Sequence, residues 1–264
     1  MTNTLTKRLI ACFDIKNGRV TKAIQFQDNI DVAPAEELAH AMYKDQIDEL
    51  IFYDIMASAE KRAIDIETVK RVAKRVFIPF TVGGGIRDIN DMYETLKAGA
   101  EKISIDSMAV RNPDIITQGA KAFGSQCIVL STQVKRTEGF PSGYEVYVDG
   151  ARKATGLDAL EWIKRGADLG AGEICINSID KDGTLSGYDL ELMKMAEAAV
   201  SVPLIASGGA GEPVHLYDVF SQTEAQAAII SSMLYSPRLK RNYPVHELKS
   251  YLLEKGVPVR PTRL

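Results

Sequence analysis

Short apolar runs recur along the chain at nearly even intervals, with longer amphipathic stretches between them. Eight such runs occur in 264 residues, which is about 33 residues for each run. They span residues 9–13, 49–53, 78–82, 102–105, 127–130, 173–177, 203–206 and 227–230. Most are continuously apolar rather than alternating, and this pattern predicts strands that are buried on both faces, as parallel sheets require.

The stretches between the runs carry apolar residues at helical spacing, as in residues 35–42 and 66–74. Eight strand–helix units in series predict an α/β fold, namely a (β/α)8 TIM barrel formed by residues 1–264 as a single domain. A doubly wound open sheet is the competing topology, and it explains eight regular units less well.

The two halves of the chain repeat the same residue types after corresponding strands. Three pairs lie 125 or 126 residues apart: Gly83 and Gly208, Ser107 and Ser232, and Asp54 and Asp180. A repeat of this length predicts a barrel built from two similar half-barrels.

The charge balance excludes several classes of partner. Lys and Arg number 32 against 35 Asp and Glu, so no basic excess indicates a nucleic acid or a membrane surface. Three scattered cysteines (Cys12, Cys127 and Cys175) are typical of buried thiols in a reducing compartment. No apolar run resembles a signal peptide or approaches the roughly 18 residues of a membrane span. We therefore expect a cytoplasmic protein, and the residues predict neither a metal site nor a cofactor.

In this architecture chemistry occurs where the carboxyl ends of the strands meet the following loops. Glycine-rich turns, residues 83–85 and 208–209, follow the third and seventh runs, and a serine follows the next strand in each half (Ser107 and Ser232). Glycine allows backbone N–H groups to approach an anion closely. Tight turns use glycine in any case, but two turns related by the repeat favour two phosphate sites and a substrate with a phosphate at each end.

Carboxylates also follow the runs. Asp14 ends the first run, where a partly desolvated carboxylate can act as a general acid or base. A helix cap, or a partner for Lys16 or Lys22, is the alternative role. Asp180 and Asp182 resemble part of a calcium loop, but the closing Glu is missing and we exclude that site.

Seven segments carry a specific family pattern: ACFDIKNGRVTK, DELIFYDIMASAEKR, IPFTVGGGIRD, EKISIDSMAVRNP, FGSQCIVL, RGADLGAGEICINSIDKDGTLSGYD and PLIASGGAG. They resemble the cyclase subunit of imidazole glycerol phosphate synthase, the HisF family, over essentially the whole chain. The resemblance implies a lyase or cyclase-type synthase subunit on a (β/α)8 barrel with a two-fold repeat. It also implies a glutaminase (HisH-like) partner whose ammonia crosses the barrel to a bisphosphorylated ribonucleotide derivative. The products would be imidazole glycerol phosphate and an aminoimidazole carboxamide ribotide.

The resemblance also implies roles for individual residues. Asp14 matches the first catalytic Asp, and Gln133 falls at the position of the second. Matches to substrate and phosphate positions, together with the serine from the repeat, are Lys22, Gly85, Asp106, Ser107, Asp182, Gly183, Gly209 and Ser232. Four charged residues match the gate of the ammonia channel: Arg8, Glu49, Lys102 and Glu173.

The four gate residues also follow from position alone. Each stands at the start of its expected strand, so two cations and two anions would converge at the bottom of the barrel. Buried charges are costly unless they are paired, and these balance. A purely structural ion-pair network is the alternative to a gate.

Two positions depart from the family pattern. Gln133 cannot titrate, and the loss of a general acid–base partner typically costs about 10²–10⁴ in rate. Asp106 falls where the family has a phosphate-site Asn, and a carboxylate there repels a phosphate, so we expect a weakened first phosphate site.

Because the departures lie at the chemistry while the gate is kept, the sequence favours a divergent paralogue. It would pass ammonia to a different phosphorylated small molecule or sugar acceptor, in surface-polysaccharide sugar amidation, with a third, ATP-using protein. One alternative is the histidine-pathway cyclase itself. Another is a non-catalytic ammonia conduit that activates the glutaminase. A third is an unrelated isomerase on the same half-barrel plan.

Overall fold

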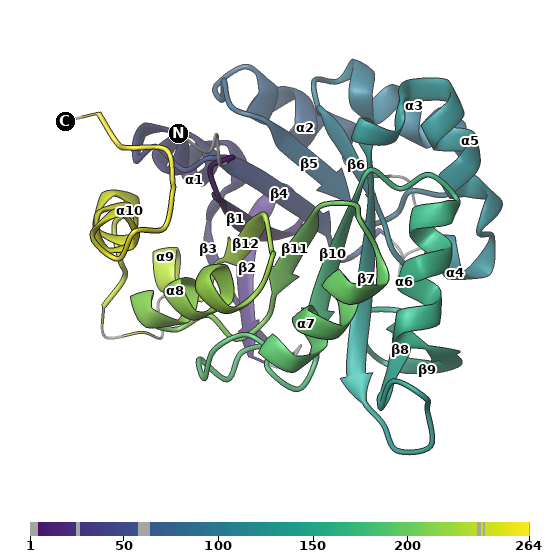
Figure 1. Cartoon of the computed structure of the whole chain (residues 1–264). Coiled ribbons are helices and arrows are strands. Elements are labelled where there is room, and N and C mark those ends of the chain that lie inside the picture. The colour runs from purple at the N-terminus through teal and green to yellow at the C-terminus, as the bar shows by residue number, and fades with distance from the viewer. Residues whose placement is uncertain (1–4, 25–26, 58–63, 237–238, 240, 264) are drawn as a thin grey trace.

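A closed barrel of parallel strands forms the centre of the protein (Figure 1). The computed structural model describes residues 5–24, 27–57, 64–236, 239 and 241–263. The barrel strands are β1 (Arg8–Lys16), β4 (Glu49–Asp54), β5 (Phe80–Gly83), β6 (Lys102–Ile105), β7 (Ile128–Arg136), β10 (Glu173–Ser178), β11 (Leu204–Ser207) and β12 (Ala227–Ile230). Pairing of β7 with β10 and of β12 with β1 closes the ring, and this confirms the predicted (β/α)8 barrel.

Helices alternate with the strands and cover the outside of the barrel (Figure 1). The longer ones are α1 (Ala35–Lys44), α2 (Ile66–Ala73), α3 (Ile89–Lys97), α5 (Asp114–Phe123), α6 (Ala159–Asp168), α7 (Leu190–Ala199), α8 (Pro213–Gln222) and α10 (Val245–Glu254). Shorter ones are α4 (Ser107–Arg111), α9 (Ser232–Tyr235) and the 3₁₀ helix η1 (Ser125–Cys127). Asp65, Asp88, Asp158 and Asp189 precede four of the helices and accept hydrogen bonds from first-turn N–H groups, which stabilises these starts.

Two β-hairpins extend the barrel on the side toward which the strands run, at the bottom of Figure 1. The first consists of β2 (Arg19–Ile24) and β3 (Gln27–Pro34) and continues from β1, whereas β8 (Tyr144–Val148) and β9 (Lys153–Asp158) continue from β7. The same addition in each half supports the two-fold repeat. Both hairpins were absent from the eight predicted strands. Asn17 and Gly18, with φ of 51° and 74°, form the two-residue turn of the first hairpin.

Two apolar layers hold the fold together. The larger one packs the outer face of the strands against the helices. The smaller one fills the barrel interior and consists of Ile10, Ile51, Val129, Cys175, Ile205, Ala227 and Ile229. All three cysteines are free; Cys175 is buried as predicted, but Cys12 and Cys127 are only partly buried. Across the described part of the chain, no helix is long and apolar enough to cross a membrane.

Candidate active site at the carboxyl ends of the strands

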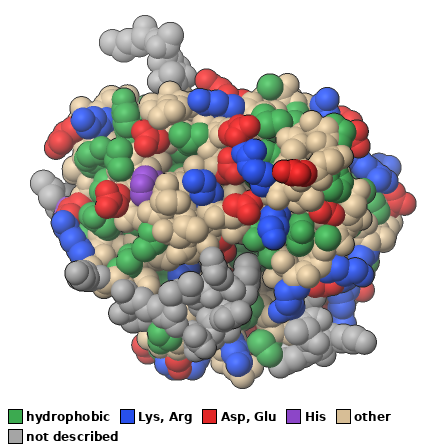
Figure 2. Space-filling view, turned by 90° about the horizontal axis from the view of Figure 1, so that it is seen from below, with side chains coloured by type: hydrophobic (Ala, Val, Ile, Leu, Met, Phe, Trp, Pro, Cys, Tyr) green, Lys and Arg blue, Asp and Glu red, His purple; other side chains and the backbone are tan. Residues whose placement is uncertain are grey.

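The carboxyl-terminal end of the barrel, here called the mouth, collects most of the predicted site residues. Figure 2 shows the molecule from this side, with acidic, basic and apolar side chains interspersed on its surface. Asp14 lies near the end of β1, opposite Thr21 of β2. Lys22, the next residue of β2, donates a hydrogen bond from Nζ to Oγ of Ser231, at 2.8 Å, and Ser231 follows β12, the neighbour of β1.

Asp14 is placed for proton transfer. Burial raises the pKa of its carboxyl group, while the nearby Lys22 ammonium lowers it and the carboxylate of Asp182 raises it again. Its carboxyl therefore combines a raised proton affinity with a cation close by, which is a suitable environment for a general acid or base.

Gln133 belongs to a row of hydrogen-bonded side chains on the other side of the mouth. Asn177 is its register partner on β10 and donates from Nδ2 to Oε1 of Gln133, at 2.8 Å. The side chain of Gln133 also acts on the carboxyl group of Asp106, which directly follows β6, and lowers its pKa. Oδ1 of Asn177 accepts a hydrogen bond from Oγ of Ser207, at 2.8 Å, and the Asn177 amide lowers the pKa of Asp182. The hydrogen-bonded row therefore runs Gln133–Asn177–Ser207, with Asp106 beside one end of it.

The carboxyl group of Asp106 titrates near neutrality. Burial raises its pKa to about 7, the side chain of Gln133 lowers it, Asp149 raises it and Arg111 lowers it. Asp106 also raises the pKa of the Cys175 thiol, so it lies close to the barrel interior. An acid with such a pKa exchanges its proton readily at neutral pH.

This proximity bears on the sequence interpretation of Gln133. The sequence predicts that an amide alone replaces a carboxylate on this side of the mouth, with Asp106 assigned to a phosphate site. In the structure Asp106 lies close enough to Gln133 for the amide to lower its pKa. The mouth therefore has a carboxyl group beside the position where the family pattern has one.

The two glycine-rich turns fold tightly against neighbouring backbone. A Cβ on Gly84 would lie 2.4 Å from the carbonyl oxygen of Asp54, and one on Gly209 would lie 2.1 Å from that of Gly187. Gly85 follows with a φ of 79°. These close approaches require glycine, so backbone packing explains the turns even without a bound phosphate.

The other predicted phosphate residues lie at the same end of the barrel. Gly183 adopts a φ of 73° and donates its N–H to the carboxylate of Asp182. Ser107 begins α4, and its Oγ accepts a hydrogen bond from the N–H of Asp149, at 2.9 Å. Ser232 begins α9. The two serines thus take corresponding positions in the two half-barrels.

Three strand-end residues were given no role from the sequence. Asn177 and Ser207 belong to the hydrogen-bonded row, and Ser231 holds Lys22. Asn177 is the last residue of its apolar run, and Ser207 and Ser231 directly follow theirs. Only strand register identifies their partners, because Asn177 lies opposite Gln133 on one side and Ser207 on the other.

The amino-terminal end of the barrel carries four residues in an alternating ring of charge, here called the charged ring. Arg8 contacts Glu49 and Glu173, both at 2.7 Å. Lys102 contacts the same two carboxylates at 3.4 Å and 2.8 Å. Burial by itself lowers the pKa of Arg8, but Glu173 and Glu49 outweigh it and raise this pKa overall. The convergence of four charges expected from the sequence is therefore present.

Polar groups also lie inside the barrel, between the charged ring and the mouth. The hydroxyl of Tyr53 is 3.3 Å from Oγ of Ser104 and donates to Oγ of Ser131 at 3.4 Å. Burial raises the pKa of the Cys175 thiol to about 12, although hydrogen bonds with Tyr53 and Ser131 lower it. The interior is thus not uniformly apolar along the barrel axis.

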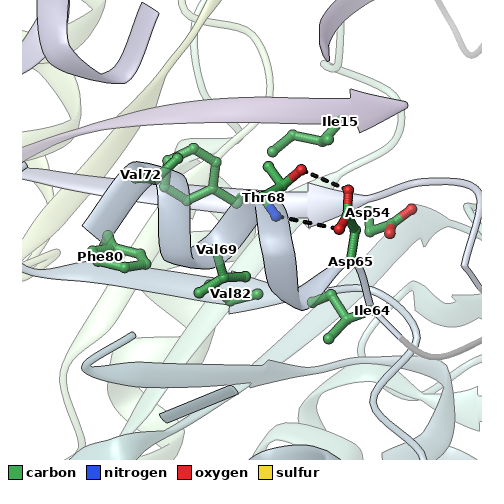
Figure 3. A pocket seen from close by; sticks show the side chains of 10 residues that line it. Ile15, Asp54, Ile64, Asp65, Thr68, Val69, Val72, Phe80 and Val82 are labelled. Atoms are coloured by element: carbon green, nitrogen blue, oxygen red, sulfur yellow. Dashed lines mark hydrogen bonds between the residues drawn. The ribbon is translucent and has the colours of Figure 1, made fainter. Parts of the chain in front are cut away.

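A separate pocket lies outside the barrel, where α2 covers β1, β4 and β5 (Figure 3). Apolar side chains such as Val69, Phe80 and Val82 form most of its wall. Asp65 binds Thr68 there through the backbone N–H and the hydroxyl, as a helix cap. The pocket belongs to the packing of α2 rather than to the mouth. In the described ranges, no group of three or more His, Cys, Asp or Glu could hold a metal ion.

Comparison with known proteins agrees with this geometry. The family described as "Histidine biosynthesis protein" matches residues 8–240. Imidazole glycerol phosphate synthase subunit HisF of Desulfosudis oleivorans is 51% identical over 97% of this chain and 98% of its own length. The HisF subunit of Syntrophobacter fumaroxidans is 50% identical over 98% of this chain and 99% of its own length. The chain therefore belongs to the HisF family of imidazole glycerol phosphate synthase subunits.

Proposed function

We propose that this chain is the ammonia-using synthase subunit of an imidazole glycerol phosphate synthase, with catalysis at the mouth. The observation that carries the proposal is the presence of two titratable carboxyl groups there, Asp14 and Asp106, in a chain about half identical to named HisF subunits. Lys22 and the glycine turns supply the surroundings that an anionic substrate needs.

The charged ring supports an entry for ammonia at the opposite end. Its side chains are 10–22% exposed, so the ring lies at the surface of the barrel bottom rather than deep inside. A glutaminase docked on this end would release ammonia next to the ring. The hydroxyls of Tyr53, Ser104 and Ser131 would then provide hydrogen-bond partners on the way to the mouth.

For the acceptor, we propose the bisphosphorylated ribonucleotide intermediate of histidine synthesis. The sequence alone favours a different acceptor, such as a sugar in a surface-polysaccharide pathway, because Gln133 breaks the catalytic carboxylate pair. Asp106 supplies a carboxyl group next to Gln133, so this reason for expecting a different acceptor no longer applies.

The test is turnover of the histidine-pathway intermediate by the purified chain with an ammonium salt as nitrogen source. We expect both products, imidazole glycerol phosphate and the aminoimidazole carboxamide ribotide, at a rate on the order of 1 s⁻¹. A second assay replaces ammonium by glutamine plus a HisH-type glutaminase, and the same products are expected.

Two results would contradict the proposal. If the intermediate is not converted with ammonium while an amino sugar or another acceptor is, the chain acts in a different pathway. If it accelerates the glutaminase but converts no acceptor, it is a conduit and not an enzyme.

A further inference from the structure

Asp106 and Gln133 lie at the ends of neighbouring strands, and the Gln133 side chain lowers the pKa of Asp106. β6 pairs with β7 in parallel, with Ile105 opposite Leu130, so the two strands end side by side in the mouth. Asp106 is the first residue after β6, and Gln133 is on the part of β7 that extends beyond this pairing. In the strand order of the barrel, β7 is diametrically opposite β1 and β6 is next to it. Asp106 and Asp14 therefore face the mouth from opposite sides.

The amide of Gln133 has a fixed orientation. Its oxygen accepts from Asn177 at 2.8 Å, and the oxygen of Asn177 in turn accepts from Ser207. An amide held in this way keeps its NH₂ group for a second partner and cannot turn its oxygen toward the carboxylate of Asp106 without losing the bond to Asn177. Gln133 thus gives Asp106 a polar neighbour of fixed orientation, although it cannot itself exchange a proton.

We propose that Asp106 is the general acid of the mouth, acting opposite Asp14 as the base, and that Gln133 is its positioning residue. The inference rests on the proposed function. It moves the second proton-transfer group from β7 to the end of β6, one strand away.

The surroundings of Asp14 favour the ionised carboxylate that a base needs, and those of Asp106 favour the protonated form that an acid needs. Lys22 lies near Asp14 and favours its ionised form, the form that a base needs. Around Asp106 the charged and titratable groups are Asp149 from the β8–β9 turn, Arg111 from α4 and Cys175 from β10. Arg111 is itself paired with Asp149, so its charge is largely compensated. Asp106, with a pKa of about 7, therefore carries a proton in a large fraction of molecules at neutral pH.

The proton balance of ammonia addition uses both groups. When the nitrogen lone pair of ammonia forms a bond to a carbonyl carbon, the C=O π bond breaks and its electron pair goes to the oxygen. Asp14 takes one proton from the nitrogen and Asp106 gives one to the oxygen, which yields a neutral carbinolamine, and a proton then returns from Asp14 to Asp106 through solvent. Loss of water breaks the C–O bond: Asp106 gives the oxygen its second proton, and Asp14 takes a second proton from the nitrogen as the C=N bond forms. A second return of a proton from Asp14 to Asp106 restores the starting state. No oxidant or reductant is needed.

The experiment compares three variants with the unaltered chain in ammonium-dependent turnover of the bisphosphorylated intermediate. Asp106→Asn removes the acid and should lower kcat by about 10²–10⁴ with little change in KM. Its pH profile should lose the limb near pH 7 that the unaltered chain shows. The double variant Asp106→Asn/Gln133→Asp moves the carboxyl group to β7 and should recover kcat to within about tenfold. The amide would then stand after β6 and the carboxyl group on β7, so both groups remain at neighbouring strand ends.

Asp168→Asn is the matched control. It makes the same chemical change at an exposed position of α6, away from Asp106. Its kcat at the pH optimum should stay within about threefold, because it carries no proton to substrate.

The outcomes separate the two proposals. No turnover by the unaltered chain rejects the proposed function. Normal turnover that Asp106→Asn retains, or a pH limb near 7 that persists in this variant, overturns the role of Asp106. A folded double variant that is no faster than Asp106→Asn overturns the exchange of positions between the two strands. Circular dichroism and thermal unfolding of each variant establish that the comparison is made between folded proteins.

Discussion

The charged side chains at the two ends of the barrel differ in how completely they are paired with opposite charges. At the charged ring, two cations and two anions alternate, and each carboxylate contacts both cations within 3.4 Å. At the mouth, three carboxyl groups (Asp14, Asp106 and Asp182) have raised pKa values, mainly because of burial. Lys22 is the cation that acts on two of them, Asp14 and Asp182.

This difference separates a structural use of charge from a chemical one. The ion pairs of the charged ring connect the four strands that carry them, β1, β4, β6 and β10. Carboxyl groups that are buried with few cations keep a proton up to a higher pH, and such groups can exchange protons with a substrate near neutral pH. The mouth is therefore the end where proton chemistry is expected, whereas the charged ring suits recognition or gating.

The largest expected effect is the loss of Asp14. Asp14→Asn should reduce ammonium-dependent kcat by about 10²–10⁴, since it removes the base and leaves the shape almost unchanged. Asp168→Asn, an exposed site on α6, is the control and should leave kcat unchanged. Steady-state kinetics with the bisphosphorylated intermediate gives the answer, and a kcat within threefold for Asp14→Asn would remove Asp14 from the mechanism.

The next effect concerns the charged ring. Lys102→Met leaves Glu49 and Glu173 with one cation between them, so the free energy of unfolding should fall by about 3 kcal/mol. Ammonium-dependent kcat should stay within about threefold, because the mouth is untouched. Urea unfolding measures the stability, with Lys97→Met as control, since that lysine side chain is 63% exposed. Equal stability of the two variants would show that the ring contributes no more than a surface pair.

A smaller effect, on stability, compares a glycine in the mouth with a glycine in the loop between β7 and β8. Gly209 and Gly139 both have positive φ, 104° and 90°, so alanine costs backbone strain at either position. A Cβ would meet the carbonyl oxygen of Gly187 at 2.1 Å in the first case and nothing within 4 Å in the second. Gly209→Ala should therefore be less stable than Gly139→Ala by about 2 kcal/mol. Thermal unfolding of both variants tests this, and equal melting temperatures would mean that the turn after β11 relaxes freely.

The last effect is a dependence of stability on pH. The pKa of Asp106 is raised in the folded chain, so its stabilising contribution is complete below the unfolded value and is lost as pH rises toward 7. Asp106→Asn escapes this loss. Relative to the unaltered chain it should gain about 4 kcal/mol between pH 4 and pH 8. Urea unfolding at both pH values measures the gain, and a constant difference would show that folding does not raise the pKa of Asp106.

Much of the fold follows from the sequence because parallel strands are buried on both faces. The predicted runs 102–105 and 227–230 coincide with β6 and β12. The β5 strand begins two residues later than its run, at Phe80, because the turn before it includes Pro79. The hairpins were missed because charged and polar residues interrupt the apolar ones in their strands, as in β2 (RVTKAI) and β9 (KATGLD), although the Asn17-Gly18 pair is a hairpin signal in its own right.

The candidate site was predicted as a set of strand-end residues, and the structure brings them to one end of the barrel. The contact between Asp106 and Gln133 was beyond the sequence, because 27 positions separate them and only the register of β6 against β7 sets them side by side. Gln133 by itself removes a carboxyl group from the family pattern, and Asp106 by itself removes an amide. Because the two residues lie at neighbouring strand ends, together they keep one carboxyl group and one amide in adjacent positions.

The most direct test of the proton chemistry assigned to the mouth is the titration of Asp106 in the folded chain, followed by the ¹³C resonance of its carboxyl group. Asp106→Asn identifies the resonance by its disappearance. The resonance is predicted to shift with a midpoint near pH 7. The carboxyl group of Asp91, whose pKa is lowered by its hydrogen bond with Arg87, should show no transition in that range. A midpoint for Asp106 near the ordinary value for Asp, about 4, would contradict the account.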